Sequence, residues 1–399
     1  MPDEHVDFGR GILNRWMLDP AITYLNHGTV GAVPRAVLAA QQAIRDEMER
    51  QPSRFLLREV YPLAGTAAGT PTRMRRAADA VASFLGAHGK DLVFVDNATA
   101  GVNAVVRSLP FRAGDEILIT DHSYPTTASL AAFVAAQQGA IVRTVRVPYP
   151  RFDAARLVAE VDAAIGPRTR LAIFDHVTSE SALVFPLAEL ASRCRARGVA
   201  VLADAAHAPG MLPVNVAELG VDWYAGNLHK WAFAPRSCGI LWAREDQQHV
   251  LHPPVISWGL GKGFTAEFDW VGTRDPTPWL AAPDGIAFAR ALGLDALRRH
   301  NHDLAWQAAR ELTARWRTPL ERDEDSVGSM VTIALPEPLG STVEDAARLR
   351  DALLEEDRIE IQIYGGHGRL WTRISAQAYN DWSDIERLGE VIERRTSRV

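Results

Sequence analysis

Residues 199–242 read VAVLADAAHAPGMLPVNVAELGVDWYAGNLHKWAFAPRSCGILW, and this stretch contains the clearest indication of how the chain folds. It opens with the apolar run 199–203, which is typical of a strand buried on both faces of a parallel sheet. Asp204 follows at once, so we expect its carboxylate at the carboxyl end of that strand, where open α/β sheets bind ligands. A second apolar run, 221–225, leads into GNLHKW and places Lys230 near the end of another strand.

An aspartate and a lysine that leave neighbouring strands toward one crevice fit a chemistry built on pyridoxal phosphate. The lysine forms a Schiff base with the aldehyde, and the aspartate keeps the pyridine nitrogen protonated so that the ring accepts electrons. The alternative is a helix-capping Asp204 and a solvated Lys230, which either residue taken alone would favour. The pair in this context favours the cofactor site.

The same stretch resembles the fold-type I, class V aminotransferase superfamily. Within it, DAAHAPG followed by GNLHKW is most similar to the isopenicillin N epimerase-like branch, and kynureninase is a more distant relation. The resemblance spans nearly the whole chain. It implies an α/β fold like that of aspartate aminotransferase, with a mainly parallel seven-stranded sheet in a large domain and a smaller α+β domain. We expect residues 1–50 to associate with the small domain, 51–278 to form the large domain that binds pyridoxal 5'-phosphate, and 279–399 to form the small domain.

Composition excludes several classes of protein. The 399 residues have a net charge of −6, so no excess of basic residues invites nucleic acid. No apolar stretch approaches the roughly 18 residues of a membrane span, and the N-terminus is acidic where a signal peptide is basic. The two cysteines, Cys194 and Cys238, are too few for a disulfide framework or a cysteine-rich metal site. We therefore expect a cytoplasmic protein with no membrane partner and no metal.

Strand-like and helix-like segments alternate from residue 92 onward. Strand-like runs occur at 92–95, 117–119, 141–147, 171–174, 199–203 and 237–242. Helix-like segments lie at 98–108, 126–138, 154–165 and 187–197. This alternation predicts a mainly parallel sheet covered on both faces.

The flanking regions have other patterns. Upstream, 35–50 has helical spacing, 51–72 reads as an irregular connection and 73–85 as a helix. Downstream, we predict helices at 279–292, 302–316, 342–354 and 382–394, and strands at 330–334, 359–363 and 370–374. Fewer strands separated by helices predict the smaller lobe.

The segment DNATAGVN (96–103) follows the first of these strands and opens a helix. Backbone amides at a helix N-terminus, aided by a threonine hydroxyl, bind phosphate. An ordinary capped helix explains the same residues equally well. Because the superfamily's phosphate cradle is at this point of the chain, the resemblance assigns Ala98, Thr99 and Ala100 to the phosphate.

Further site residues come from the resemblance. In DHSYPTT (121–127), Tyr124 stacks on the cofactor ring, unless it simply packs against the sheet end. In HVTSES (176–181), Ser179 lies where cysteine desulfurases have an asparagine near the phenolic oxygen of the ring. His207 has the position of a superfamily residue that reaches the same oxygen, although a hydrogen-bonded histidine at a helix start explains it equally well. His229 is expected at the phosphate.

Two more motifs concern assembly and substrate. Thr273 in DWVGTRD (269–275) resembles the threonine that crosses from a neighbouring subunit to the phosphate, which implies a homodimer with shared active sites. Arg373 in LWTRIS (370–375) is expected to bind the α-carboxylate of an amino acid, with Asn26 nearby.

The inferred reaction begins with an external aldimine, followed by removal of the α-proton by Lys230 to leave a carbanion. Return of a proton on the opposite face makes the protein an amino-acid epimerase, for which Tyr124, His207 and His27 are candidate donors. The alternatives are a C–S β-lyase on a cysteine conjugate, an aminotransferase, or a catalytically silent binding module. Cysteine desulfuration is disfavoured because Cys238 lies in a predicted buried strand.

Overall fold

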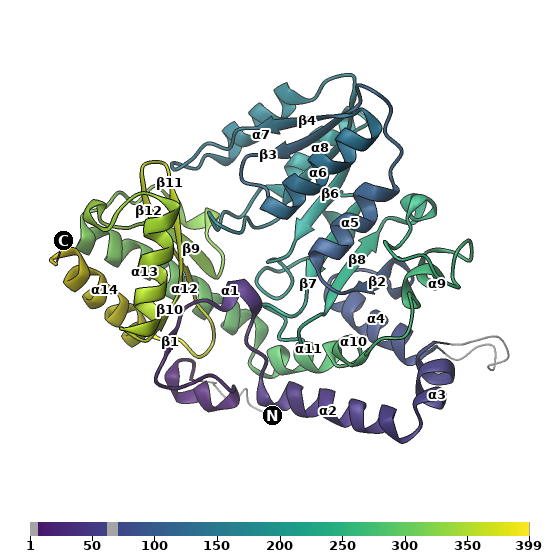
Figure 1. Ribbon diagram of the computed structural model, residues 1–399, viewed down its shortest axis with the longest axis horizontal. Coiled ribbons are helices and arrows are strands. Elements are labelled where there is room, and N and C mark those ends of the chain that lie inside the picture. The colour runs from purple at the N-terminus through teal and green to yellow at the C-terminus, as the bar shows by residue number, and fades with distance from the viewer. Residues whose placement is uncertain (1–6, 62–70, 399) are drawn as a thin grey trace.

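The computed structural model describes residues 7–61 and 71–398. A larger lobe built on a twisted sheet lies beside a smaller lobe that contains α13, α14 and the strands β9 to β12 (Figure 1). No helix in these described ranges is long and apolar enough to cross a bilayer.

The large sheet has seven strands in the order β2-β8-β7-β6-β5-β3-β4. Their bounds are β2 Leu92–Val95, β3 Glu116–Thr120, β4 Ile141–Val145, β5 Thr169–Asp175, β6 Ala200–Ala205, β7 Trp223–Asn227 and β8 Gly239–Ala243. Only β8 runs antiparallel to its two neighbours. The predicted mainly parallel sheet is therefore confirmed, and the carboxyl ends of β5, β6 and β7 meet at one edge.

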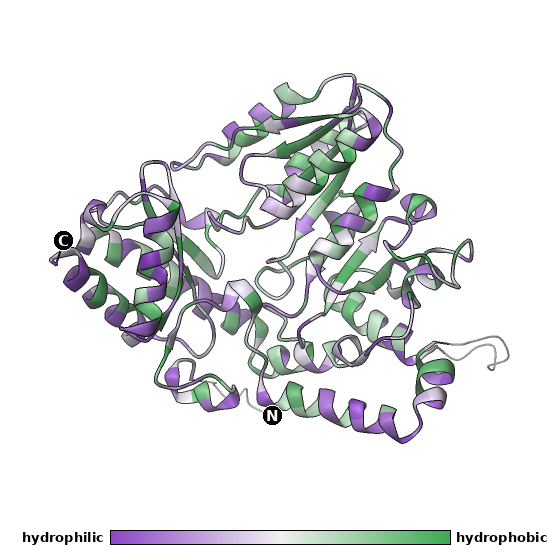
Figure 2. Ribbon diagram, in the orientation of Figure 1, coloured by the Kyte–Doolittle hydropathy of each residue, from purple (hydrophilic) through white to green (hydrophobic). Residues whose placement is uncertain are grey.

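Helices cover both faces of this sheet. They are α4 Arg73–Phe84, α5 Ala98–Ser108, α6 Pro125–Gln138, α7 Ala154–Ala164 and α8 Leu187–Ala196. Side chains alternate between the faces: Leu171 packs in a core with α5 and α6, whereas its neighbour Ala172 packs with α4, α7 and α8. Figure 2 shows apolar residues along the central strands and polar residues on the outer surfaces of the helices. Burial on both faces explains why these strands read as continuous apolar runs.

The small domain has its own antiparallel sheet in the order β11-β12-β9. Its elements are β9 Met330–Ala334, β11 Gln362–Gly366, β12 Arg369–Ser375, α12 Leu294–Trp316, α13 Val343–Glu355 and α14 Trp382–Thr396. Apolar residues of the three helices and the sheet form a separate core.

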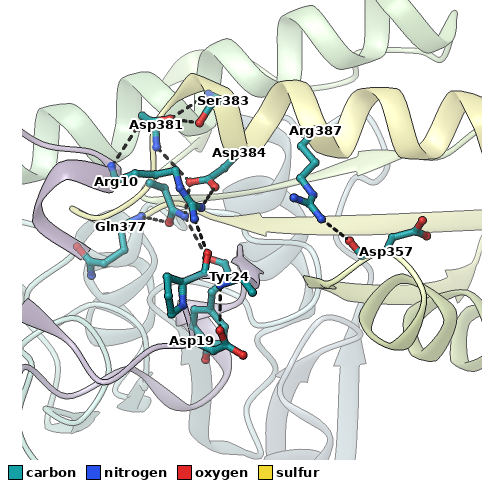
Figure 3. Close-up of polar contacts among 12 residues, drawn as sticks. Arg10, Asp19, Tyr24, Asp357, Gln377, Asp381, Ser383, Asp384 and Arg387 are labelled. Carbon is teal, nitrogen blue, oxygen red and sulfur yellow. Dashed lines mark hydrogen bonds and ion pairs between the residues drawn. The ribbon is translucent and has the colours of Figure 1, made fainter. Parts of the chain in front are cut away.

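The N-terminal segment is attached to the small domain. Strand β1 (Thr23–Tyr24) pairs in parallel with β10 (Ile359–Glu360). Arg10 Nη1 lies 2.7 Å from Asp384 Oδ1, and the Arg10 amide donates to Asp381 at the start of α14 (Figure 3). These contacts hold the 3₁₀ turn Arg10–Arg15 against the N-terminus of α14, which Asp381 itself caps by accepting from the Ser383 amide.

Three regions differ from the sequence prediction. Residues 52–60 of the predicted irregular connection are helical: they form α3 Pro52–Arg54 and a π-helical turn Phe55–Val60. They are helical because Phe55 and Val60 are buried in the core of the large domain. Residues 62–70 of the same predicted connection lie outside the described ranges. Helix α12 begins at Leu294 and not at 302, because Leu297 and Asn301 on its first turns are buried. The predicted helix 279–292 is divided into α10 Thr277–Leu280 and α11 Ala282–Ala291.

These helices bear on the predicted domain division, which stays a prediction. Helix α2 (Arg35–Arg50) matches the predicted bounds, and it packs with α10 and α11. Met48, Trp279 and Ile286 from these helices enter the core of the large domain. The contacts favour placing α2 and α11 with the large domain.

The remaining elements are α1 His27–Val30, α9 Phe264–Asp269 and short 3₁₀ turns at Arg10–Arg15, Gly89–Asp91, Val216–Glu218, Glu245–Val250, Glu324–Ser326 and Glu337–Leu339.

Candidate active site

A cavity of about 170 Å³ lies where β5, β6 and β7 end and α5 begins. It is the place at which open α/β sheets bind ligands. Of the residues that the sequence predicted for the site, its wall contains Ala98, Thr99, Tyr124, Ser179, Asp204, His207, His229 and Lys230.

Lys230 follows β7 and is only 9% exposed. Burial, together with the positive charge of Arg373, lowers the pKa of its amine to about 7, and Asp204 offsets part of this shift. Two glycines with positive φ allow the backbone to pack closely around it. A Cβ on Gly31 would lie 2.0 Å from the His229 carbonyl oxygen, and one on Gly210 would lie 2.4 Å from the backbone of Trp231. The backbone around the lysine is therefore closely packed, and with a pKa of about 7 much of the amine is neutral near pH 7.

His207 contacts the lysine directly, with Nε2 3.2 Å from Lys230 Nζ. Its other nitrogen, Nδ1, accepts from the indole N–H of Trp231 at 3.5 Å. Burial lowers the pKa of the imidazole well below its usual value. An indole can only donate, so the single proton of the neutral ring is assigned to Nε2, which faces the lysine amine.

Asp204 is the last residue but one of β6, at the carboxyl end as predicted, and it is buried. Thr127 Oγ1 donates to one carboxyl oxygen at 3.0 Å, and the Ala206 amide donates to the other at 3.2 Å. Burial raises the pKa of this carboxyl, although both hydrogen bonds oppose the shift. A second carboxyl, Asp175, stands at the paired position of β5 and lines the same cavity. Burial and the neighbouring Asp204 raise the pKa of Asp175 well above its usual value.

The start of α5 offers fewer free amides than the sequence suggested. The Ala98 amide donates to Asn227 Oδ1 at 2.8 Å, and the Ala100 amide donates to the capping side chain of Asn97 at 2.9 Å. Ala100 is also absent from the cavity wall. The phosphate assignment consequently depends on Thr99. His229 lines the cavity, and its Nδ1 is hydrogen-bonded to the Cys238 carbonyl at 3.1 Å. Its Nε2 is therefore left for another partner.

Arg373 lies on β12 with its side chain 1% exposed. Nη1 donates to the Ser179 carbonyl at 2.6 Å, and Nη2 donates to Thr29 Oγ1 at 2.8 Å. Asn26 Oδ1 is 3.5 Å from Nη2, and its amide group is held by Glu360. Every hydrogen-bond acceptor of this guanidinium among the described residues is neutral. A buried cation whose partners are all neutral is suited to bind a carboxylate.

Besides Ala100, four residues named from the sequence do not line the cavity: Asn26, Arg373, Thr273 and His27. Thr273 is exposed and does not line the cavity of its own subunit. His27 is buried between the Lys230 carbonyl, at 3.0 Å, and the Tyr379 hydroxyl, at 2.9 Å. The His27 ring is therefore hydrogen-bonded to the backbone of Lys230 and helps to hold it in place.

Sequence reasoning missed Thr29, Thr127, Asp175 and Asn227. Asp175 could have been predicted from the sequence, because it follows an apolar run just as Asp204 does. Thr127 and Asn227 lie inside motifs that were recognised, but nothing local indicates that their side chains reach Asp204 and Ala98.

The profile of the family "Aminotransferase class-V" matches residues 23–388. The chain belongs to the aminotransferase class V family. It is 36% identical to the isopenicillin N epimerase of Streptomyces clavuligerus, over 96% of this chain and 97% of that protein. It is 33% identical to a probable chloroplastic L-cysteine desulfhydrase of Arabidopsis thaliana, over 94% of this chain and 83% of that protein.

Solved structures agree with the fold. The class V chain superposes on the cystine C-S lyase C-DES, in complex with its reaction product cysteine persulfide, with a TM-score of 0.79. That comparison covers 96% of this chain and 98% of the other at 22% identity. The protein therefore has the fold of type I enzymes dependent on pyridoxal phosphate, and the predicted fold class is confirmed.

As a class V enzyme, the protein uses pyridoxal 5'-phosphate. The cavity fits this group on its own geometry, since a buried amine of lowered pKa, a buried carboxyl and the N-terminus of a helix converge in its wall. Family membership sets aside the alternative of a catalytically silent binding module.

Proposed function

We propose that this enzyme removes the α-proton of an amino acid with Lys230 and returns a proton to the same carbon from the opposite side, as an amino-acid epimerase. The observation that supports it most concerns Lys230 and Arg373: Lys230 lines the cavity, and Arg373, a cation whose acceptors are all neutral, donates to Ser179 and Thr29 of the same cavity wall. An amine with a pKa of about 7 can accept a proton at neutral pH.

The cofactor, when bound, supplies an electron sink for the bond that is broken at Cα. We infer that Lys230 holds its aldehyde carbon, that Asp204 faces the pyridine nitrogen, and that Thr99 and His229 bind the phosphate. We further infer that Tyr124 packs on the ring, while Ser179 and His207 lie near its phenolic oxygen. Thr273 of a second subunit would complete the phosphate site.

Arg373 would bind the α-carboxylate through two charge-assisted hydrogen bonds. Its present partners, Ser179 and Thr29, are neutral, so a carboxylate can displace or join them without separating an ion pair. Asn26 is engaged by Glu360 and by Thr29 Oγ1 at 2.5 Å, so we assign it to positioning Thr29 and not to the substrate.

The geometry narrows the choice of the second proton donor. His207 touches Lys230 Nζ and so shares its side of the site, and His27 is outside the wall. Tyr124 lines the cavity with 39% of its surface exposed. We therefore assign the opposite-side proton to the Tyr124 hydroxyl.

β-Elimination from a cysteine conjugate is the second candidate. It is supported by the 33% identity to a probable L-cysteine desulfhydrase and by the fact that elimination needs one base only. Desulfuration by a cysteine nucleophile finds no support, because Cys238 is buried beside β8 and burial raises the pKa of its thiol.

Incubation with L-amino acids and cysteine conjugates in deuterated water tests these proposals. Deuterium at Cα with inversion supports the epimerase, and a Tyr124→Phe variant should then exchange the α-proton without inverting the centre. Release of pyruvate and ammonia would show a β-lyase, and transfer to a keto acid would show an aminotransferase. Arg373→Ala should lower kcat/KM about 100-fold, since a charge-assisted contact contributes about 2 to 3 kcal/mol.

A further inference from the structure

A second cavity, of about 230 Å³, adjoins the cofactor cavity between the two domains. Tyr124 and Ser179 line both cavities. Arg373 donates to the Ser179 carbonyl at 2.6 Å, so the guanidinium lies at the junction. An amino acid anchored there by its α-carboxylate has the second cavity available for its side chain.

Aromatic rings form much of this wall. Tyr149 comes from the large domain, and Tyr364 and Trp371 come from the β11–β12 hairpin of the small domain. The Tyr149 and Trp371 ring centroids are 5.4 Å apart, and the Trp371 indole N–H is already used by the Gly366 carbonyl at 2.9 Å. The Trp371 indole therefore offers mainly its π face to a ligand, and π faces attract cations.

Besides its tyrosines, the wall contains four ionisable side chains: Asp121, His122, Glu180 and His367. Asp121 accepts from the Val147 amide at 2.8 Å. His122 is bonded to Ser181 Oγ at 2.7 Å, and burial lowers its pKa to about 4. Glu180 differs, because it is exposed in the wall and its carboxylate has no hydrogen-bond or ion-pair partner among residues 7–61 and 71–398.

Among basic side chains, His367 is exposed in the wall, whereas Arg322 is not part of the lining and packs on the Tyr149 ring. The described lining includes no lysine or arginine. Arg322 stacks on Tyr149 with its guanidinium carbon 4.7 Å from the ring centroid, and it donates to the Pro150 carbonyl at 2.9 Å. Glu180 directly follows Ser179, the residue at the junction of the two cavities. Once a substrate carboxylate neutralises Arg373, Glu180 is the exposed charged residue closest to this junction along the chain.

We propose that the second cavity binds the substrate's side chain, and that this side chain ends in a positively charged group paired with Glu180 against Tyr149, Tyr364 and Trp371. The proposal rests on the proposed function, because it takes Arg373 as the anchor of the α-carboxylate. It names the substrate class as α-amino acids with an extended cationic side chain.

Binding to the full-length holoenzyme, followed by the change in cofactor absorbance, tests the charge preference. L-Lysine, L-2-aminoheptanoate and L-2-aminoadipate have side chains of similar length that are positive, neutral and negative. We expect the Kd of lysine to be about 10-fold lower than that of aminoheptanoate, and aminoadipate to bind most weakly. Glu180→Gln should remove most of the preference for lysine while leaving the Kd of aminoheptanoate unchanged.

Glu344→Gln is the matched control, because Glu344 is an exposed carboxylate on α13, in the small domain and outside the wall of either cavity. It should preserve the preference for lysine, and Glu180→Lys should reverse the preference toward aminoadipate. Equal Kd values for the three amino acids, or an equal effect of Glu180→Gln on all of them, would overturn the charge assignment alone. If no amino acid changes the cofactor spectrum, the proposed function fails, and this assignment fails with it.

Discussion

Lys230 is the residue whose ionisation controls capture of the cofactor. Its pKa is lowered to about 7 by burial and then by Arg373, so the nucleophilic neutral amine predominates above that pH. We expect the rate of pyridoxal phosphate uptake by apoenzyme to rise with pH through a midpoint near 7. Arg373→Met should move the midpoint upward, because one of the two causes is removed. A midpoint near 10, as for an ordinary lysine, would contradict the buried site.

Asp175 is a buried carboxyl whose pKa is raised well above the value of about 4 that it has in an unfolded chain. The folded state therefore holds a proton that the unfolded state releases, and stability contributed by the protonated form is lost as pH rises from about 4 through the folded-state pKa. Asp175→Asn removes this dependence. The Tm of the variant apoenzyme should therefore rise relative to that of wild-type apoenzyme as the pH increases from 5 to 8.

Asp121→Asn is a useful comparison, because Asp121 is an exposed aspartate close to the same cavity system. Its Tm difference from wild type should vary less with pH. Parallel Tm curves for wild type and Asp175→Asn would show that Asp175 is ionised throughout this range.

At the scale of an element, α14 depends on its cap. The Asp381 side chain accepts from the Ser383 amide at 3.0 Å and from the Arg10 amide at 3.0 Å, so it satisfies a helix donor and holds the N-terminal segment (Figure 3). Asp381→Ala should lower the free energy of unfolding by about 1 to 2 kcal/mol in urea denaturation. Asp303→Ala, at an exposed site within α12, should change it by less than about 0.5 kcal/mol. Equal losses in the two variants would contradict a capping role for Asp381.

At the scale of the whole molecule, we predict a homodimer. Thr273 is exposed outside its own cavity, where a second subunit could use it, and the nearby loop exposes the large apolar side chains Val255, Ile256, Trp258 and Leu260. Light scattering should give twice the mass of the chain, and Trp258→Glu should weaken association. Thr273→Ala should lower affinity for the cofactor while the mass stays dimeric. A stable monomer that binds the cofactor tightly would refute shared sites.

The sequence by itself determined the large sheet and indicated which two side chains to expect at its ligand edge. Buried parallel strands need apolar residues on both faces, so their runs are visible locally, and the polar residue that ends a run marks the ligand edge. Asp204 and Lys230 were predicted as site residues for this reason, and both line the cavity at that edge. Helices with a regular apolar face, such as α2 and α5, were likewise predicted with their observed bounds.

The tertiary structure alone decided which residues meet. Strand order places Asp175 beside Asp204, brings Thr127 to the Asp204 carboxylate, and joins Arg373 to Thr29 and Ser179 from three distant parts of the chain. Local patterns encode whether a residue is buried but not which strand lies next to its own. The same limit explains residues 52–60, whose helix depends on burying Phe55 and Val60 in a core made by remote elements.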